Sequence, residues 1–353
     1  MVEGDLHRFL DKKFEGDIIY TSAFPNKPLG GLTLSRETIP LDLVPPTNAE
    51  LEYALLEVGV QTHSTSIEWR VKVNGINITK EFKPVLTANL RDKLLAKLIY
   101  DITSILRRPE ALRRNRVNIT FKREGGKPII IEHIGLVALF KAPEASSSIK
   151  YYSGVLSLEP GEKAGYSIGF TGENPTLKSA VYIPSRQAQM MISVNGSEHI
   201  ELTNIQGLSE VVKELRGVNR VDTIEFLHHD TGERYAPRQV RVYNLLLHST
   251  TYAKPELNIE SIDVPREADK EVTAKIVIKN KGDSKPDKAL LVVMCFGNVV
   301  FNTELEPLDP GASTLKEIKF SLPPGEYETV FRVIWRKLTR MWYKDFRIKL
   351  KVK

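Results

Sequence analysis

The sequence predicts an all-β protein of three units: two tandem β-sandwiches, the first with an inserted helix, followed by a third β-sandwich. Apolar and polar residues alternate in short runs that are rich in branched and aromatic side chains, as in half-buried strands. Short motifs in residues 48–140 return in the same order in residues 174–252. After residue 254, turn signals separate strand-like runs at intervals of about ten residues. The expected units are residues 1–144, 149–252 and 254–353.

The repeat depends on three motifs that contain asparagine. They lie at residues 48–54, 70–75 and 115–117 in the first copy, and at residues 174–180, 191–196 and 219–221 in the second. Asn74-Gly75 and Asn195-Gly196 both lie between apolar runs, where Asn and Gly tolerate the positive φ of a tight hairpin turn. Three matches in one order predict a tandem duplication. The alternative is that two unrelated β units share turn chemistry.

Other segments are expected to be helical or irregular. Leucine and isoleucine recur at spacings of three and four through residues 87–106, which predicts an amphipathic helix. A shorter helical stretch is expected at residues 208–215, and a short polar helix or loose tail at residues 1–13. Pro143 and three consecutive serines mark residues 141–148 as a linker between the first two units.

Composition and charge describe an ordinary globular protein. Of 353 residues, 41% are hydrophobic and 27% are charged. No window of about eighteen uncharged apolar residues is present, so no transmembrane segment is expected, and the N-terminus lacks the apolar stretch of a secretory signal. The net charge of +6 arises from 50 basic and 44 acidic residues that are interspersed. Such mixing argues against specific nucleic-acid recognition and would suit a thermophile.

No catalytic motif is present in the sequence. A phosphate-binding glycine loop, a nucleophile elbow, a zinc-protease helix and a cysteine pair are all missing. Cys295 is the only cysteine, and its apolar neighbours predict a buried thiol. His228 and His229 are adjacent on an expected strand and point to opposite faces, which favours a polar hairpin end over a metal site. We therefore expect no enzymatic activity, no cofactor and no metal site, although a glycosidase carboxylate pair is not readable from sequence alone.

One basic cluster is the candidate binding site. Five arginines lie within ten residues, in a segment that Pro109 is expected to keep irregular. Guanidinium groups hold phosphate, sulfate or carboxylate through bidentate hydrogen bonds. A solvated loop is the alternative, and the sequence favours it. The candidate residues for an anion or a partner are Arg107, Arg108, Arg113, Arg114 and Arg116.

Two parts of the chain resemble known families. The turns Lys279-Asn280-Lys281-Gly282 and Leu308-Asp309-Pro310-Gly311-Ala312-Ser313 resemble those of CARDB domains, which are cell-adhesion-related, immunoglobulin-like modules of archaea and bacteria. This resemblance covers residues 254–337 and implies an immunoglobulin-like sandwich. Residues 71–75, 100–106 and 115–120 are similar to the strands and the Asp-Ile-Thr turn of galactose-binding-like jelly rolls. The second unit lacks the Asp-Ile-Thr element, so its interpretation as a tandem jelly roll depends on the repeat.

Members of both families often serve outside the cytoplasm, as modules of enzymes or surface assemblies. The resemblance therefore implies a non-enzymatic protein for adhesion, surface assembly or carbohydrate binding at the cell surface or outside the cell. Its partner would be another protein, further copies of itself or a glycan. The missing secretory signal instead suggests the cytoplasm or a virus particle. Two alternatives remain: a coat-like structural protein of a virus particle or another assembly, and an accessory subunit of a carbohydrate-active enzyme.

Overall fold

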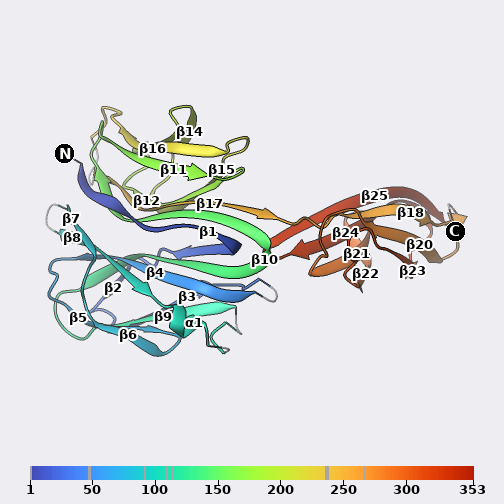
Figure 1. Cartoon of the computed structure of the whole chain (residues 1–353), viewed down its shortest axis with the longest axis horizontal. Coiled ribbons are helices and arrows are strands. Elements are labelled where there is room, and N and C mark those ends of the chain that lie inside the picture. The colour runs from blue at the N-terminus through green and yellow to red at the C-terminus, as the bar shows by residue number, and fades with distance from the viewer. Residues whose placement is uncertain are drawn as a thin grey trace. The chain divides into compact units, whose positions relative to one another are not determined.

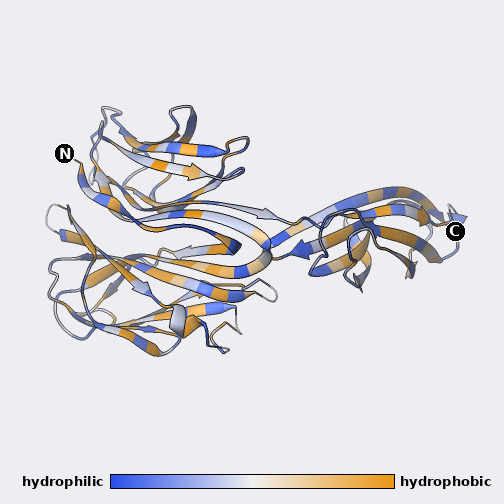
Figure 2. Ribbon diagram, in the orientation of Figure 1, coloured by the Kyte–Doolittle hydropathy of each residue, from blue (hydrophilic) through white to orange (hydrophobic). Residues whose placement is uncertain are grey.

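The computed structural model describes residues 2–46, 49–90, 93–108, 110–112, 115–234, 238–265 and 267–353. These residues form 25 strands, β1 to β25, and one four-residue helix, α1, so the predicted all-β class is confirmed. The chain divides into two compact units, Met1–Thr251 and Tyr252–Lys353. No described helix is long and apolar enough to cross a bilayer. Polar and apolar residues alternate along many strands (Figure 2), as expected of sheets with one buried face.

A nine-stranded central sheet forms the middle of the first unit. Seven strands follow in the order β15-β12-β17-β10-β4-β8-β7, and β1 and β2 also pair with β10. Strands β1 and β10 both bend, so the sheet folds into two halves that face each other (Figure 1). The bounds are β1 Glu3–Ala23, β2 Lys27–Leu29, β4 Glu50–Thr62, β7 Leu86–Leu90, β8 Lys93–Asp101, β10 Ile129–Leu158, β12 Thr176–Ile183, β15 Gly207–Glu214 and β17 Val240–Tyr252.

A four-stranded outer sheet covers each half of the central sheet (Figure 1). The first outer sheet has the order β3-β9-β5-β6 and the second has the order β11-β16-β13-β14. In the central sheet, β4 lies between β10 and β8, and β12 lies between β17 and β15. The strand orders of the two sandwiches therefore match, which supports the predicted duplication. The first sandwich packs its core around Phe121 and the second around Phe226. The bounds are β3 Arg36–Asp42, β5 Glu68–Val73, β6 Ile76–Glu81, β9 Arg116–Lys122, β11 Lys163–Thr171, β13 Gln189–Val194, β14 Glu198–Leu202 and β16 Arg220–His229.

The expected linker at residues 141–148 was wrong, because this segment lies inside strand β10. Strand β1 pairs with β10 on both sides of the bend. At the bend the register shifts, and a Cβ on Gly16 would lie 2.2 Å from the Phe140 carbonyl oxygen. The two sandwiches therefore share the 21-residue β1 and the 30-residue β10 instead of being joined by a flexible segment there.

The helix expected at residues 87–106 was also wrong. These residues form β7 and β8, and only α1, Thr103–Leu106, is helical. Leu95 and Leu98 point to opposite faces of β8, and both are fully buried. Because both faces of β8 are covered, apolar residues do not alternate with polar ones along it. Their spacing therefore resembles that of a helix. Residues 208–215 likewise belong mostly to strand β15, and residues 3–13 begin β1.

A buried ion pair lies between the two halves of the central sheet. The Lys97 Nζ on β8 is 2.8 Å from the Glu57 Oε2 on β4, and neither side chain is more than 1% exposed. Ser153 on β10 and Asn244 on β17 donate hydrogen bonds to the same carboxylate. A Cβ on Gly135 would lie 2.3 Å from the Glu57 Oε1, so this glycine makes room for the carboxylate. Strands of both sandwiches therefore meet at one charged group.

The second unit is a sandwich of a three-stranded sheet, β18-β20-β23, and a five-stranded sheet, β19-β25-β24-β21-β22. Asn280 is buried, and its Nδ2 donates to the carbonyl oxygens of Ser284 at 2.8 Å and Leu308 at 2.9 Å. A Cβ on Gly282 would lie 2.1 Å from the Lys254 carbonyl oxygen, so close packing requires glycine there. The bounds are β18 Leu257–Asp263, β19 Glu267–Ala268, β20 Glu271–Asn280, β21 Lys288–Cys295, β22 Asn298–Leu305, β23 Ser313–Ser321, β24 Gly325–Lys337 and β25 Arg340–Val352.

Candidate functional site

The first outer sheet turns polar side chains away from the core. On β9, Val117 and Ile119 are buried in the core, and Asn118 between them faces outward. Strands β3 and β5 alternate in the same way, because successive side chains of a strand point to opposite faces. The outer face is therefore lined by hydroxyl, amide and cationic groups.

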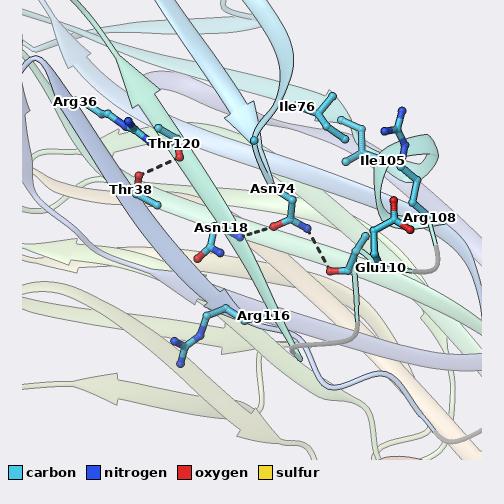
Figure 3. Close-up of a pocket in the computed structure, with 12 residues that line it drawn as sticks. Arg36, Thr38, Asn74, Ile76, Ile105, Arg108, Glu110, Arg116, Asn118 and Thr120 are labelled. Atoms are coloured by element: carbon cyan, nitrogen blue, oxygen red, sulfur yellow. Dashed lines mark hydrogen bonds between the residues drawn. The ribbon is translucent and has the colours of Figure 1, made fainter.

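A groove with a volume of about 850 Å³ lies on this face, and Figure 3 shows it from close range. Strands β3 and β9 form the floor of this first groove, the β5–β6 turn forms one end, and α1 with the turn after it forms a wall. Ile76 and Ile105 are apolar members of the lining. Its polar members include Arg36, Thr38, Asn74, Arg108, Arg116 and Asn118.

Asn74 connects three parts of the first groove. It occupies the hairpin turn with a φ of 48°, followed by Gly75 with a φ of 84°. Its Oδ1 accepts a hydrogen bond from the Asn118 N–H at 2.9 Å, and its Nδ2 donates to the Ala111 carbonyl oxygen at 3.2 Å (Figure 3). The Asn-Gly motif thus does more than turn the chain, because its side chain ties the turn to the floor and to the wall.

The wall is anchored on strand β4. The Thr103 Oγ1 accepts a hydrogen bond from the Ala54 N–H at 2.9 Å, and the Asp101 Oδ1 accepts one from the Thr103 N–H at 2.9 Å. Arg107 donates from Nε to the Leu51 carbonyl oxygen at 3.1 Å and from Nη2 to the backbone of β4 one residue later. The Arg107 guanidinium therefore holds the wall against β4, and it does not line the first groove.

The first groove carries more positive than negative charge. Arg116 Nε lies 3.1 Å from Asp42 Oδ1, and both side chains are more than half exposed. Arg36 and Arg108 make no ion pair with any residue that the structure describes. Glu110 is the one carboxylate among the described lining residues.

A row of three cations crosses the sheet beside the first groove. Lys122 on β9 lies directly opposite both Arg36 on β3 and Arg70 on β5. Opposed like charges lower the stability of a sheet. Glu124 offsets part of this repulsion through an ion pair with Lys122. An anion bound beside the three cations would offset more of their repulsion.

The structure separates the arginines that the sequence grouped together. Arg108 and Arg116 line the first groove, whereas Arg107 binds the backbone of β4. Arg113 and Arg114 lie outside the described residues. Sequence reasoning missed Arg36, which comes from a distant strand. No local signal showed that this strand, β3, pairs with β9.

The lining points to binding chemistry. With a single described carboxylate, the first groove has no pair of acids for glycoside hydrolysis. Within the described residues, no three His, Cys, Asp or Glu side chains are placed to hold a metal ion. Cys295, in the second unit, is buried, as predicted. Guanidinium, amide and hydroxyl groups suit an oxyanion together with neighbouring hydroxyls.

Comparison with known proteins gives only distant likenesses. No protein-family model and no curated protein match the chain. A CARDB domain from Pyrococcus furiosus, in complex with di-metal ions, is 15% identical, with 29% of this chain and 96% of that chain covered and a TM-score of 0.24. A β-galacturonidase from Eisenbergiella tayi bound to galacturonate is 14% identical, with 54% of this chain and 36% of that chain covered and a TM-score of 0.23.

A β-glucuronidase from Bifidobacterium dentium, complexed with coumarin-3-O-glucuronide, is 12% identical, with 57% of this chain and 39% of that chain covered and a TM-score of 0.22. The match thus spans little more than a third of the length of each of these two glycosidases. At such TM-scores the likenesses carry no argument about activity, ligand or partner.

Proposed function

We propose that the protein is a non-enzymatic binding protein that holds an acidic carbohydrate in the first groove. The observation that carries this proposal is the placement of Arg36, Arg108 and Arg116 around a floor of amides and hydroxyls. Guanidinium groups pair with carboxylate or sulfate, and the floor exchanges hydrogen bonds with sugar hydroxyls. Ile76 and Ile105 supply apolar contact for the carbon face of a sugar ring.

An acidic glycan fits this groove better than nucleic acid does. The volume of about 850 Å³ lies in the range of sites for small organic ligands. Proteins hold single-stranded nucleic acid by stacking its bases on aromatic side chains. The described lining of the first groove contains no aromatic residue, so base stacking has no platform there.

Calorimetry with uronate-containing and sulfated hexasaccharides tests the proposal. We expect saturable binding that weakens between 0.1 M and 1 M salt, where the Debye length falls from about 10 Å to about 3 Å. Arg108→Gln removes a guanidinium without an ion-pair partner among the described residues, and should weaken binding about tenfold. The triple variant with Arg36→Gln and Arg116→Gln should abolish it.

Arg220→Gln is the matched control. Arg220 occupies the position in the second repeat that Arg116 occupies in the first, it is exposed, and it pairs with Asp222 at 2.7 Å. This substitution should leave binding of acidic hexasaccharides unchanged. Binding that persists in the triple variant, or that does not respond to salt, would contradict the proposal.

Phe296 in the second unit supports a second candidate function, assembly between copies of this chain. It lies in the β21–β22 turn with a φ of 47°, and it is 74% exposed. Bulky residues avoid this conformation, and six of the eight non-glycine residues with positive φ in the described chain are asparagines. Strain retained at an exposed aromatic ring is typical of a contact site. Light scattering tests this candidate: an oligomer that Phe296→Asn dissociates supports it, and a monomeric wild type contradicts it.

A further inference from the structure

The second sandwich is hollowed at the position that the first groove occupies in the first sandwich. This second groove, with a volume of about 300 Å³, lies on the outer face of the second outer sheet. Its lining comes from β11, β16, the end of β13 and the β13–β14 turn. Of these, β11, β16 and the turn correspond to β3, β9 and the β5–β6 turn of the first groove. The residues that matter here are Gly165, Ser167, Ser193, Gly196, Thr223 and Glu225.

The Asn-Gly turn is built alike in both grooves. Asn195 has a φ of 52°, close to the 48° of Asn74. The Asn195 Oδ1 accepts hydrogen bonds from the N–H groups of Asp222 at 2.8 Å and Thr223 at 3.2 Å, and its Nδ2 donates to the Arg220 carbonyl oxygen at 2.9 Å. In each sandwich the asparagine side chain therefore ties the turn to the floor strand.

Strand register then matches the floor residues of the two grooves. On the floors, Thr38 corresponds with Gly165 and Thr120 with Glu225; on the neighbouring strands β5 and β13, Lys72, which does not line the first groove, corresponds with Ser193. Where the first sandwich has the cation Lys72, the second has the hydroxyl of Ser193. Where the first has the hydroxyl of Thr120, the second has the carboxylate of Glu225. The duplicated framework is thus kept, and the chemistry on it differs.

The second groove is polar without being basic. The Glu225 Oε2 lies 3.0 Å from the Lys163 Nζ, so the charge of this carboxylate is balanced. Ser167 and Thr223 add hydroxyls, and the described lining contains no arginine. Gly165 keeps the floor open, because a Cβ built on it meets no atom within 4 Å.

We propose that the second groove is a separate binding site for a neutral saccharide. Sugar hydroxyls donate to the Glu225 carboxylate, and hydrogen bonds to an ionised acceptor are among the strong ones. Ser167 and Thr223 exchange further hydrogen bonds, and the bare floor at Gly165 lets a sugar ring approach the sheet. Lys163 already balances the carboxylate, so a cationic ligand has no advantage, and an acidic ligand finds no guanidinium partner.

Binding at both grooves would make the chain bivalent. The two outer sheets lie on opposite sides of the first unit (Figure 1), so the grooves face away from each other. A short glycan occupies one groove only, and a chain with both grooves filled links two glycans of different charge. The inference about the second groove does not depend on what the first groove binds.

Calorimetry of the full chain with neutral hexasaccharides of glucose, xylose, mannose and galactose is the test. It is done at 1 M NaCl, where a Debye length of about 3 Å suppresses ionic attraction at the first groove. We expect one of the four to bind at a single site, about tenfold more weakly after Glu225→Gln, because the neutral amide is a weaker acceptor. Gly165→Val should abolish binding, because its methyl groups fill the floor without meeting other atoms at Cβ.

Glu317→Gln on β23 is the matched control, because Glu317 is also a partly exposed strand carboxylate near a lysine, with Lys275 at 4.0 Å. It should leave binding unchanged. Thermal melting checks that the variants are folded. If Gly165→Val has a lower melting temperature than the wild type, the binding affinity of Glu225→Gln alone tests the proposal. The proposal is overturned if no neutral hexasaccharide binds at millimolar concentration, if binding survives Glu225→Gln at full strength, or if only a cationic amino-sugar hexamer binds.

Discussion

Replacing Lys97 by methionine tests whether the buried ion pair stabilises the contact between the two sandwiches. The Lys97 ammonium lies 2.8 Å from the Glu57 carboxylate, and the side chains are 0% and 1% exposed. Methionine keeps much of the side-chain volume but leaves Glu57 buried without its cation. Breaking a buried pair by removing one partner lowers stability by about 3–5 kcal/mol.

The pKa of Glu57 leads to a similar magnitude. Burial raises this pKa, but the charges of Lys97 and His133 and the hydrogen bonds from Lys97 and Ser153 outweigh burial and lower it from 4.5 to about 2. At about 1.36 kcal/mol per pKa unit, this depression corresponds to roughly 3 kcal/mol at neutral pH. The pKa of Lys97 is also lowered, because burial outweighs the attraction of Glu57. Removing the ammonium also removes its desolvation cost, so we expect a loss of stability in the lower part of the range of about 3–5 kcal/mol.

Differential scanning calorimetry of the full chain measures this effect. In a unit of this size, a loss of about 3–5 kcal/mol lowers the melting temperature by roughly 6–20 °C. Only the transition of Met1–Thr251 should move, because Tyr252–Lys353 forms a separate unit. Lys83→Met is the control: Lys83 pairs with Glu81 at the surface, where the side chains are 81% and 66% exposed, and should contribute little. An equal shift in Lys97→Met and the control would refute the reasoning.

Three other residues report on acid sensitivity, core packing and backbone strain. Burial, with the charge of Lys97, lowers the pKa of His133 from 6.5 to about 3, so the unfolded chain binds a proton that the folded chain does not. The melting temperature of the first unit should therefore fall between about pH 6.5 and pH 3, with a second loss from Glu57 between pH 4.5 and about 2. His133→Gln should flatten the first decline, and an unchanged pH profile would contradict this. Leu98→Ala should lower the free energy of unfolding in urea by about 2–5 kcal/mol, and a loss below about 0.5 kcal/mol would argue against a β8 buried on both faces. Phe296→Asn should raise the melting temperature of the second unit, because a left-handed backbone costs bulky residues about 1–2 kcal/mol and asparagine less; a lower melting temperature would show that the ring stabilises the turn.

Turn chemistry could be predicted from the sequence, and the surroundings of strands could not. Asn74 and Asn195 mark their hairpins because the positive φ is a local requirement. Gly282 likewise belongs to a motif that a close approach of two backbones explains. The helix error around Leu95 and Leu98 has the opposite origin. Both faces of β8 are buried only because a sheet folds back on itself, and that is a property of the whole first unit.

The candidate site was predictable only where its residues are neighbours in the chain. Arg108 and Arg116 attracted attention because they lie close together in the sequence. Arg36 joins them only through the pairing of β3 with β9, which no local pattern encodes. Of the second groove, the sequence indicated only the Asn195-Gly196 turn, because Gly165 and Ser167 shape the floor by being small.

The shared strands β1 and β10 have a consequence for how the first unit forms during synthesis. Glu3 pairs with Ser157, and Ala23 pairs with Ile134. At roughly 5–20 residues per second, a ribosome needs on the order of ten seconds after β1 to make its partner strand. During that time β1 has unpaired backbone groups that invite pairing with other chains. The first sandwich can complete its share of the central sheet once residue 141 is made, whereas the second must wait for β17, which ends at Tyr252, so the whole sheet is protected only late in synthesis.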